Sequence, residues 1–107
     1  MKQASLTVLA VSLLAFSSAA QAQTGLASYY GGRGHGMTCA HRTLPMGTVV
    51  TVRTHAGRSV QCVVNDRGPF VRGRIIDVTP AAARAIGFSG LAHVNVTVVG
   101  HGHHGSI

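Results

Sequence analysis

The chain has 107 residues, which is enough for one domain, and a formal charge of +7 from nine lysines and arginines against two acidic residues. Hydrophobic residues make up 46% of the chain and charged residues only 10%, which excludes a highly charged disordered polymer. The two acids are Asp66 and Asp77, and glutamate is absent. Sites built on three or more carboxylate side chains, such as an EF-hand or an acidic two-metal centre, are therefore excluded.

The first 22 residues have the features of a secretory signal peptide. Lys2 gives a basic start, residues 6–16 form an apolar run, and Ala20-Gln21-Ala22 is a small-x-small cleavage site. The run is too short to span a bilayer, which needs ~20 residues; an uncleaved N-terminal anchor helix is the alternative. The first cysteine is Cys39, far from the cleavage site. We therefore expect a soluble exported protein, periplasmic or secreted, with no lipid or membrane anchor.

Short β-strands separated by turns dominate the rest of the chain. The pattern of β-branched, apolar and aromatic residues predicts strands at residues 26–30, 49–54, 59–64, 75–78 and 94–99. Residues 31–36 are rich in glycine and indicate a loop, while His55-Ala56-Gly57 is typical of the turn of a β-hairpin. Alternation within the third strand places Cys62 on the same face as Val60 and Val64, toward the core.

One short helix is predicted over residues 81–86. Thr79 is a candidate N-cap, Pro80 suits the first helical position and Gly87 is the stop signal. Five or six closely spaced strands with one helix of about two turns favour a small, mainly β, closed or partly closed barrel. Residues 100–107 form a Gly/His-rich tail, which we expect to be flexible.

The two cysteines, Cys39 and Cys62, are candidates for a disulfide, because an exported protein meets an oxidising compartment. Such a bridge would close a loop of roughly two dozen residues and contribute ~3 kcal/mol to a small domain. Two buried free thiols are the alternative.

The two acids occupy different local contexts. Asp66 follows a predicted strand and precedes the Gly68-Pro69 turn, so it is presented at a strand-to-loop junction, whereas Asp77 lies in an apolar strand just before the helix. A purely structural role, with Asp66 paired to Arg67 or Arg72 and Asp77 bonded to turn amides, is the alternative. An ordinary glycosidase needs two carboxylates, which could only be these two. A reaction in which a hydroxyl of the substrate is the nucleophile needs one group that acts first as acid and then as base.

Five motifs in order give the chain a resemblance to the rare lipoprotein A family. They are Gly25-Leu-Ala-Ser-Tyr-Tyr-Gly31, Met37-Thr-Cys-Ala-His-Arg-Thr-Leu-Pro-Met-Gly-Thr48, Gly57-Arg-Ser-Val60, Val64-Asn-Asp-Arg-Gly-Pro-Phe-Val-Arg-Gly-Arg-Ile-Ile-Asp-Val78 and Ala81-Ala-Ala-Arg-Ala-Ile-Gly87. The resemblance implies a six-stranded double-psi β-barrel with one short helix. It also implies an endolytic peptidoglycan lytic transglycosylase, a lyase that cleaves bonds between N-acetylmuramic acid and N-acetylglucosamine in denuded glycan strands. Such enzymes leave 1,6-anhydro ends and act in wall remodelling or septation. The expected organisation is a signal peptide at 1–22, a barrel domain at 23–99 and a tail at 100–107.

Position by position, the resemblance assigns Asp66 as the catalytic aspartate, His41 as a histidine lining the same site and Asp77 as a second motif acid. The resulting hypothesis is that Asp66 protonates the glycosidic oxygen, while His41 and Asp77 orient the sugar or tune Asp66. Arginine forks bind carboxylates, and muramic acid carries one. The expected substrate-binding residues are therefore the arginines Arg42, Arg67, Arg72 and Arg74, together with Tyr30.

A second hypothesis is a non-catalytic barrel that binds peptidoglycan or another polysaccharide, as expansins do. Members of the family usually carry a glutamate in the segment that corresponds to residues 31–36, and this chain has none. That difference favours the binding alternative.

The expected partners are peptidoglycan glycan strands and, beyond them, cell-division proteins, with the chain itself acting as a monomer. We expect no cofactor and no metal ion. Zinc held by His35, His41 and Asp66 is an alternative for which the sequence specifies no further ligand, and the tail histidines could bind a transition metal weakly. Nucleic acid is not expected, because the chain is exported and its five aromatic residues include Phe16 of the signal peptide.

Overall fold

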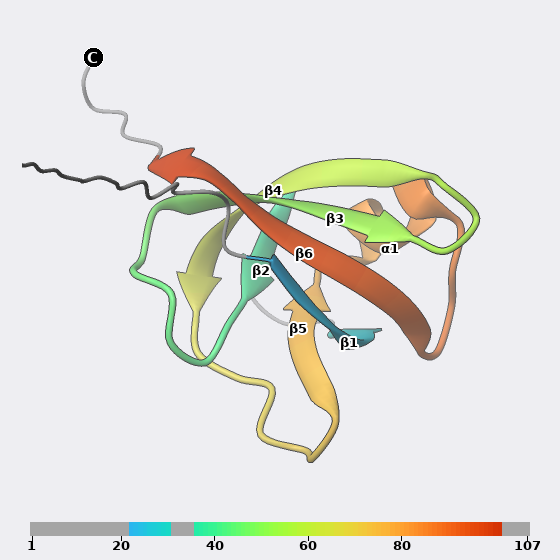
Figure 1. Cartoon of the computed structure of the whole chain (residues 1–107), viewed down its shortest axis with the longest axis horizontal. Helices are drawn as coiled ribbons and strands as arrows, with labels where there is room; N and C mark the ends of the chain where they lie inside the picture. Colours follow the sequence, from blue (N-terminus) through green and yellow to red (C-terminus); the bar gives the residue numbers. More distant parts are fainter. Residues whose placement is uncertain (1–21, 31–35, 102–107) are drawn as a thin grey trace, which may run out of the picture.

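Figure 1 shows the computed structural model of the chain, which describes residues 22–30 and 36–101. The elements follow one another as β1 (Ala22–Tyr29), β2 (Thr38–Ala40), β3 (Thr48–Thr54), β4 (Ser59–Asp66), β5 (Arg74–Val78), α1 (Pro80–Ile86) and β6 (Ala92–His101). The mainly β fold with one short helix is confirmed.

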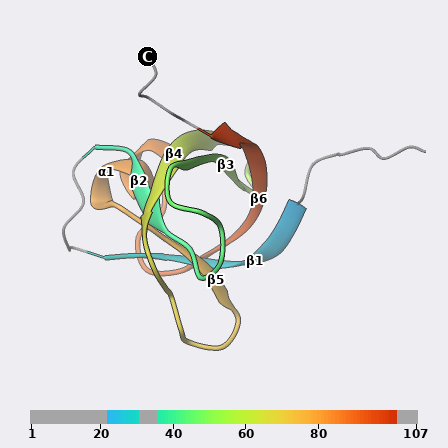
Figure 2. The same ribbon diagram turned by 90° about the vertical axis from the view of Figure 1, so that its left-hand side faces the viewer.

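The six strands close into a barrel in the order β1-β5-β2-β4-β3-β6. Two neighbouring pairs are parallel, β1 with β5 and β2 with β4, and the other pairs are antiparallel. Figure 2 looks onto the end of the barrel where the loops 41–47 and 67–73 lie side by side. Parallel strands cannot be joined by a tight turn. The two parallel pairs therefore join strands that are not consecutive in the sequence, β1 with β5 and β2 with β4.

The core lies inside the barrel and is filled by alternate residues of its strands. Cys62 and Val64 of β4 are at most 1% exposed, as the alternation predicted, and Val60 packs against this core at its edge. The other strands contribute mainly the small or β-branched side chains Ala27, Val50, Val52, Ile76, Val78, Val94 and Val96.

The helix begins and ends where its sequence signals indicate. The Thr79 hydroxyl accepts the Ala82 amide at 3.3 Å and caps the N-terminus, and Pro80 occupies the first turn. Gly87 ends the helix with φ 82°, a left-handed conformation that glycine adopts without a steric penalty. The buried face of α1, with Ile86 on it, packs against β4 and β5.

Three differences from the expected strands matter most, while β3, β4 and β5 differ from their expected bounds by only one or two residues. β2 was not predicted as a strand, because three residues are too few to show a period. β1 begins at Ala22 because its first residues pair with the end of β6, where Ala22 lies opposite Thr97. β6 continues through Gly100 and His101, which pair with β3 and so do not belong to a free tail. Most of the signal peptide, the loop 31–35 and residues 102–107 lie outside the described residues.

The two cysteines are neighbours in the core but are not a disulfide in this structure. Cys39 and Cys62 are free thiols with their Sγ atoms 2.7 Å apart, Cys62 donating to Cys39. This hydrogen bond and burial raise the pKa of the Cys39 thiol well above its ordinary value. The expected bridge is thus replaced by the alternative of buried thiols, and the parallel register explains the contact: Cys39 pairs with Val64, which puts Cys62 on the diagonal.

A candidate active site at one end of the barrel

The barrel brings its two acids to either side of one short strand. Ala40 of β2 is paired with Asp66 of β4 on one side and with Asp77 of β5 on the other. A register shift just before Ala40 skips Asn65 of β4, a bulge of the kind that re-aims side chains beside functional sites. Adjacent strands lie ~4.8 Å apart, so the Cα atoms of the two acids are separated by about 9–10 Å.

The carboxylate of Asp66 is half-buried and only partly engaged. Its Oδ1 accepts the backbone N–H of Arg67 at 2.8 Å, and its Oδ2 has no partner within the described residues. The Arg67 guanidinium does not pair with Asp66: its Nη1 donates to the carbonyl oxygens of His41 at 3.0 Å and Leu44 at 2.7 Å. The alternative of Asp66 as one half of an ion pair with Arg67 or Arg72 is therefore not what the described residues show. One carboxylate oxygen stays available to a ligand.

Asp77 has a different kind of partner. Its Oδ1 accepts the hydroxyl of Ser28, the residue with which it is paired across the parallel β1 and β5 strands. The sequence alternative of turn amides as partners is therefore incorrect. Ser28 is 6% exposed and was missed by sequence reasoning, because its relation to Asp77 exists only once β1 and β5 are adjacent.

His41 is locked in one tautomer by its surroundings. Its Nδ1 accepts the backbone N–H groups of Thr43 and Leu44, both at 3.1 Å, so this nitrogen carries no proton. The proton is then on Nε2, which lies 2.9 Å from Oε1 of Gln23 and donates to it. The ring is 3% exposed.

Electrostatics keep this imidazole neutral. Burial, followed by the charges of Arg42 and Arg67, lowers the pKa of His41 below its ordinary value of 6.5. Both ring nitrogens are occupied, so His41 organises the turn 41–44 instead of presenting a free nitrogen to a ligand.

A cavity of about 380 Å³ opens beside His41. Gln23, His41, Arg42, Thr43 and Ile75 line it. Arg42 was expected here from the sequence. Gln23 was not, because it lies 18 residues before its hydrogen-bond partner.

The remaining expected binding residues lie around the same end but do not converge on one point. Tyr30 follows β1 directly and donates its backbone N–H to Val78 at 3.2 Å, next to Asp77. Arg72 is exposed in the loop 67–73, and Arg74 is half-buried at the start of β5. The structure thus groups His41, Arg42, Asp66 and Arg67, and places Tyr30 with Asp77.

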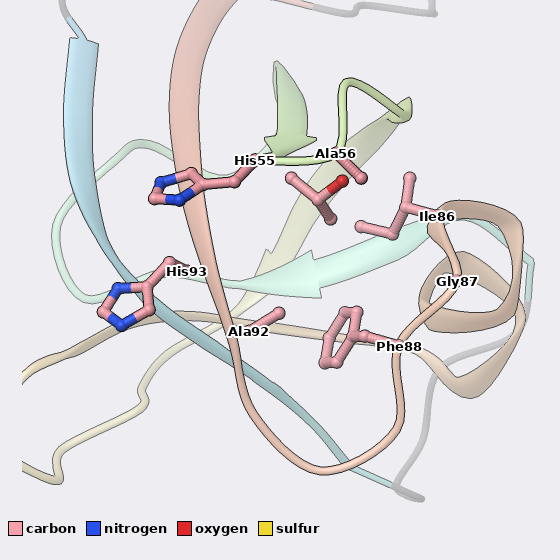
Figure 3. A pocket seen from close by; sticks show the side chains of 8 residues that line it. His55, Ala56, Ile86, Gly87, Phe88, Ala92 and His93 are labelled. Carbon is pink, nitrogen blue, oxygen red and sulfur yellow. The ribbon is translucent and has the colours of Figure 1, made fainter.

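A second cavity, of about 320 Å³, lies where the β3–β4 hairpin meets the end of α1 and the start of β6 (Figure 3). Two exposed histidines, His55 and His93, line one side of it with stacked rings whose centroids are 5.6 Å apart, and Phe88 and Ile86 line the other side with apolar groups. The chain's only two carboxylate side chains lie elsewhere, so this cavity cannot supply a carboxylic acid for catalysis. It lies at the opposite end of β4 from Asp66.

The described residues were compared with the arrangements that hold metal ions. No group of three or more His, Cys, Asp or Glu side chains in residues 22–30 and 36–101 is arranged to hold an ion. His35 lies outside these residues, so the zinc alternative is reduced to His41, whose ring nitrogens are both engaged, and Asp66.

A closed six-stranded barrel with two parallel pairs, and an aspartate at the strand-to-loop junction of one of them, defines a double-psi β-barrel protein with a candidate carboxylate site. Residues 22–98 match the lytic transglycolase domain family. The chain is 47% identical over 95 residues to a probable endolytic peptidoglycan transglycosylase RlpA of Nostoc sp., and 49% identical over 90 residues to the endolytic peptidoglycan transglycosylase RlpA of Neisseria meningitidis. The alignments cover 71% and 69% of this chain. The chain therefore belongs to the RlpA-like lytic transglycolase family.

These relatives are much longer than the chain. The matched region is 25% of the Nostoc protein and 38% of the Neisseria protein. Among solved structures, apo expansin of Clavibacter michiganensis resembles this chain with a TM-score of 0.61 over 74% of this chain and 50% of that one. At 21% identity this likeness concerns the fold alone.

Proposed function

We propose that this barrel is an exported peptidoglycan lytic transglycosylase that cleaves the bond between N-acetylmuramic acid and N-acetylglucosamine in denuded glycan strands. The observation that carries the proposal is the half-buried Asp66 carboxylate, which has one oxygen held by a backbone amide and the other without a partner in the described residues. Family membership supports the reaction class, since the relatives are named as endolytic peptidoglycan transglycosylases.

In the proposed reaction Asp66 acts twice. Its protonated carboxyl gives a proton to the glycosidic oxygen as the bond from that oxygen to C1 of the muramoyl residue breaks. The C6 hydroxyl of the same residue then forms a bond to C1, and its proton returns to the Asp66 carboxylate. The products are a free hydroxyl on one fragment and a 1,6-anhydro end on the other, and no water is consumed.

The position of Asp77 favours this one-acid scheme over a two-carboxylate hydrolysis. Asp77 is hydrogen-bonded to Ser28 of β1, on the side of β5 that faces away from β2 and β4. Asp66 lies across β2, on the opposite side. The Ser28 hydroxyl thus holds the second carboxylate away from the first, and we assign Asp77 to sugar orientation beside Tyr30.

His41 and Arg67 act as positioning residues in this proposal. His41 gathers the amides of Thr43 and Leu44, and Arg67 binds the carbonyls of the same turn. The residue after Asp66 is therefore tied to the turn 41–44, which fixes the direction of the carboxylate. Arg42 and Arg72 are exposed beside this turn and in the next loop, where they are free to bind the lactyl carboxylate of muramic acid.

The first test compares two variants of equal size and charge. We expect Asp66→Asn to reduce the release of 1,6-anhydro products from denuded glycan by at least about 100-fold, because it removes general acid–base catalysis. Asp77→Asn should retain measurable activity. Products are measured by mass spectrometry of the digested strands, with circular dichroism as the control for folding. Wild-type activity in the Asp66→Asn variant, or no anhydro product from the wild type under conditions in which another transglycosylase works, would contradict the proposal.

The second candidate function is a polysaccharide-binding barrel without cleavage. It is favoured by the absence of glutamate from residues 31–36 and, weakly, by the expansin-like fold. Retention on peptidoglycan with no new anhydro ends would select this alternative.

Export and partners belong to the same proposal. A substrate in the cell wall requires a protein outside the cytoplasm, which agrees with the signal peptide expected at residues 1–22. No helix in the described ranges combines the length and apolarity needed to cross a bilayer. Cell-division proteins as partners and a monomeric state stay predictions.

A further inference from the structure

The loop between β4 and β5 carries an aromatic side chain that the fold does not bury. Phe70 is 75% exposed, more than any other large apolar side chain within the described residues, and its neighbour Val71 is 53% exposed. Burying a phenyl ring normally stabilises a fold by about 1.5–3 kcal/mol. Phe70 forgoes most of that gain and forms, with Val71, an exposed apolar pair on this loop.

The loop is braced at both ends. On one side Arg67 donates to the carbonyls of His41 and Leu44. On the other side the backbone N–H of Leu26 in β1 donates to the carbonyl of Gly73 at 3.0 Å. The loop is therefore tied to two separate parts of the barrel and cannot swing as one body without breaking both attachments.

The base of the loop is also held. Gly68 and Pro69, which precede Phe70 in the chain, are buried. A Cβ atom placed on Gly68 would lie 3.4 Å from Cε2 of Phe70, so the edge of the ring passes close to this glycine. The backbone N–H of Arg74 closes the far side of the loop on the Val71 carbonyl at 3.0 Å. An exposed ring on a supported base loses little entropy on binding, which is typical of a recognition residue.

We infer that Phe70 is a stacking platform for a pyranose ring of the glycan, next to the linkage that Asp66 attacks; this rests on the proposed function. The loop starts immediately after Asp66, and Phe70 follows this residue by four positions in the chain. The face of a phenyl ring is negatively polarised. The axial C–H groups of a β-1,4-linked N-acetylhexosamine are positively polarised and lie on the flat faces of the sugar. The platform thus holds a neutral part of the strand while the nearby Arg72 takes a carboxylate.

A sugar platform is distinguishable from attraction by charge or by a lipid surface. Arginine contacts with the polymer weaken when salt is added, whereas stacking on an uncharged sugar does not. A ring that inserts into lipid would respond to vesicles and not to soluble sugars.

The test uses the full chain with Asp66→Asn, so that binding is measured without cleavage. The probes are an uncharged N-acetylglucosamine hexamer and denuded glycan strands in about 0.5 M NaCl, with affinity measured by calorimetry. We expect Phe70→Leu to weaken binding about fivefold or more, because it keeps an apolar side chain but removes the aromatic face, and Phe70→Tyr to stay within about twofold. Leu91→Ala removes another exposed apolar side chain, in the loop before β6, and should change nothing.

Equal sugar affinity of the Asp66→Asn protein with and without Phe70→Leu would overturn the proposal that Phe70 is a stacking platform. The absence of measurable sugar binding by the Asp66→Asn protein would overturn it as well. Loss of binding to anionic vesicles in Phe70→Leu, with glycan binding intact, would overturn it in favour of a lipid surface. If Phe70→Leu loses sugar affinity but the wild type never releases anhydro products, the platform stands and the proposed cleavage falls. If the wild type cleaves and Phe70→Leu cleaves with unchanged KM, cleavage stands and the platform falls.

Discussion

At the scale of single residues, the division of work between His41 and Asp66 is set by hydrogen bonds. Both ring nitrogens of His41 are hydrogen-bonded, Nδ1 to the amides of its own turn and Nε2 to Gln23, so this residue stabilises the turn beside the site. Asp66 uses one oxygen on the next backbone amide and keeps the other for a ligand. His41 therefore has no ring nitrogen left for a ligand, whereas one Asp66 oxygen has no partner within the described residues, which is the basis for the roles proposed for them.

The buried neutral histidine predicts a pH dependence of stability. The pKa of His41 is lower in the folded chain than its ordinary 6.5, so the unfolded chain binds the proton more readily. The contribution of His41 is therefore complete above about pH 6.5 and is lost as the pH falls through the lower folded value. His41→Gln should cost about 1–3 kcal/mol at pH 7.5, because the turn amides lose their acceptor, and the difference from wild type should shrink by pH 5.

Urea unfolding of both proteins at pH 7.5, 6 and 5 checks this expectation. The comparison isolates the effect of His41, because the rest of the sequence is the same in both proteins. A difference between His41→Gln and wild type that stays constant over this range would mean that His41 is not held neutral by the fold.

At the scale of elements, the short strand β2 is the piece on which the site depends. It separates the strands that carry the two acids, and it also carries Cys39, whose thiol touches Cys62 of β4. Contact between the two sulfur atoms inside the core means that oxidation needs little movement of either strand.

Refolding of the unfolded, reduced chain in the presence of a disulfide oxidant should therefore convert the Cys39 and Cys62 thiols to a disulfide, with loss of two protons and two electrons to the oxidant, because both thiols are buried once the chain has folded. The bridge should raise the unfolding free energy by ~3 kcal/mol, because it closes a loop of roughly two dozen residues in the unfolded chain. Thiol alkylation in denaturant, followed by mass spectrometry, counts the remaining thiols. Both thiols still reactive after oxidant treatment would contradict the expectation, with Cys62→Ala as the control that cannot form the bridge.

At the scale of the whole molecule, charge and shape contribute separately to recognition. The formal charge of +7 attracts any polyanion, whereas in the proposed function the site at the loop end of the barrel selects one. Arg42, Arg67 and Arg72 lie near that end, so the proposal directs charge attraction and cleavage to the same face.

We expect retention on intact peptidoglycan to fall severalfold between about 0.05 and 0.5 M NaCl, because added salt shortens the range of the arginine charges. A residual, salt-resistant fraction should remain, owing to contacts with neutral sugar. Pull-down assays on peptidoglycan and on dextran sulfate measure both fractions. Equal salt-resistant retention on the two polymers would reduce the binding to plain charge attraction.

Much of the local structure of this protein follows from short stretches of its sequence. Thr79, Pro80 and Gly87 set the helix because caps act within a few residues, and alternation placed Cys62 and Val64 in the core because side chains in a strand point to opposite faces in turn. The ordered motifs also indicated the family and the position of Asp66. None of these inferences required knowledge of which strands are neighbours.

The contacts between residues far apart in the chain depend on how the strands pair. Ser28 meets Asp77, Gln23 meets His41, and Ala40 comes to lie between the two acids, because parallel pairing joins strands that are far apart in the chain. The three-residue β2 has no period of its own and becomes a strand only through its neighbours. Local propensity sets the secondary structure of each segment. Closure of the barrel pairs the edges of all six strands, and this pairing sets the neighbours of each segment.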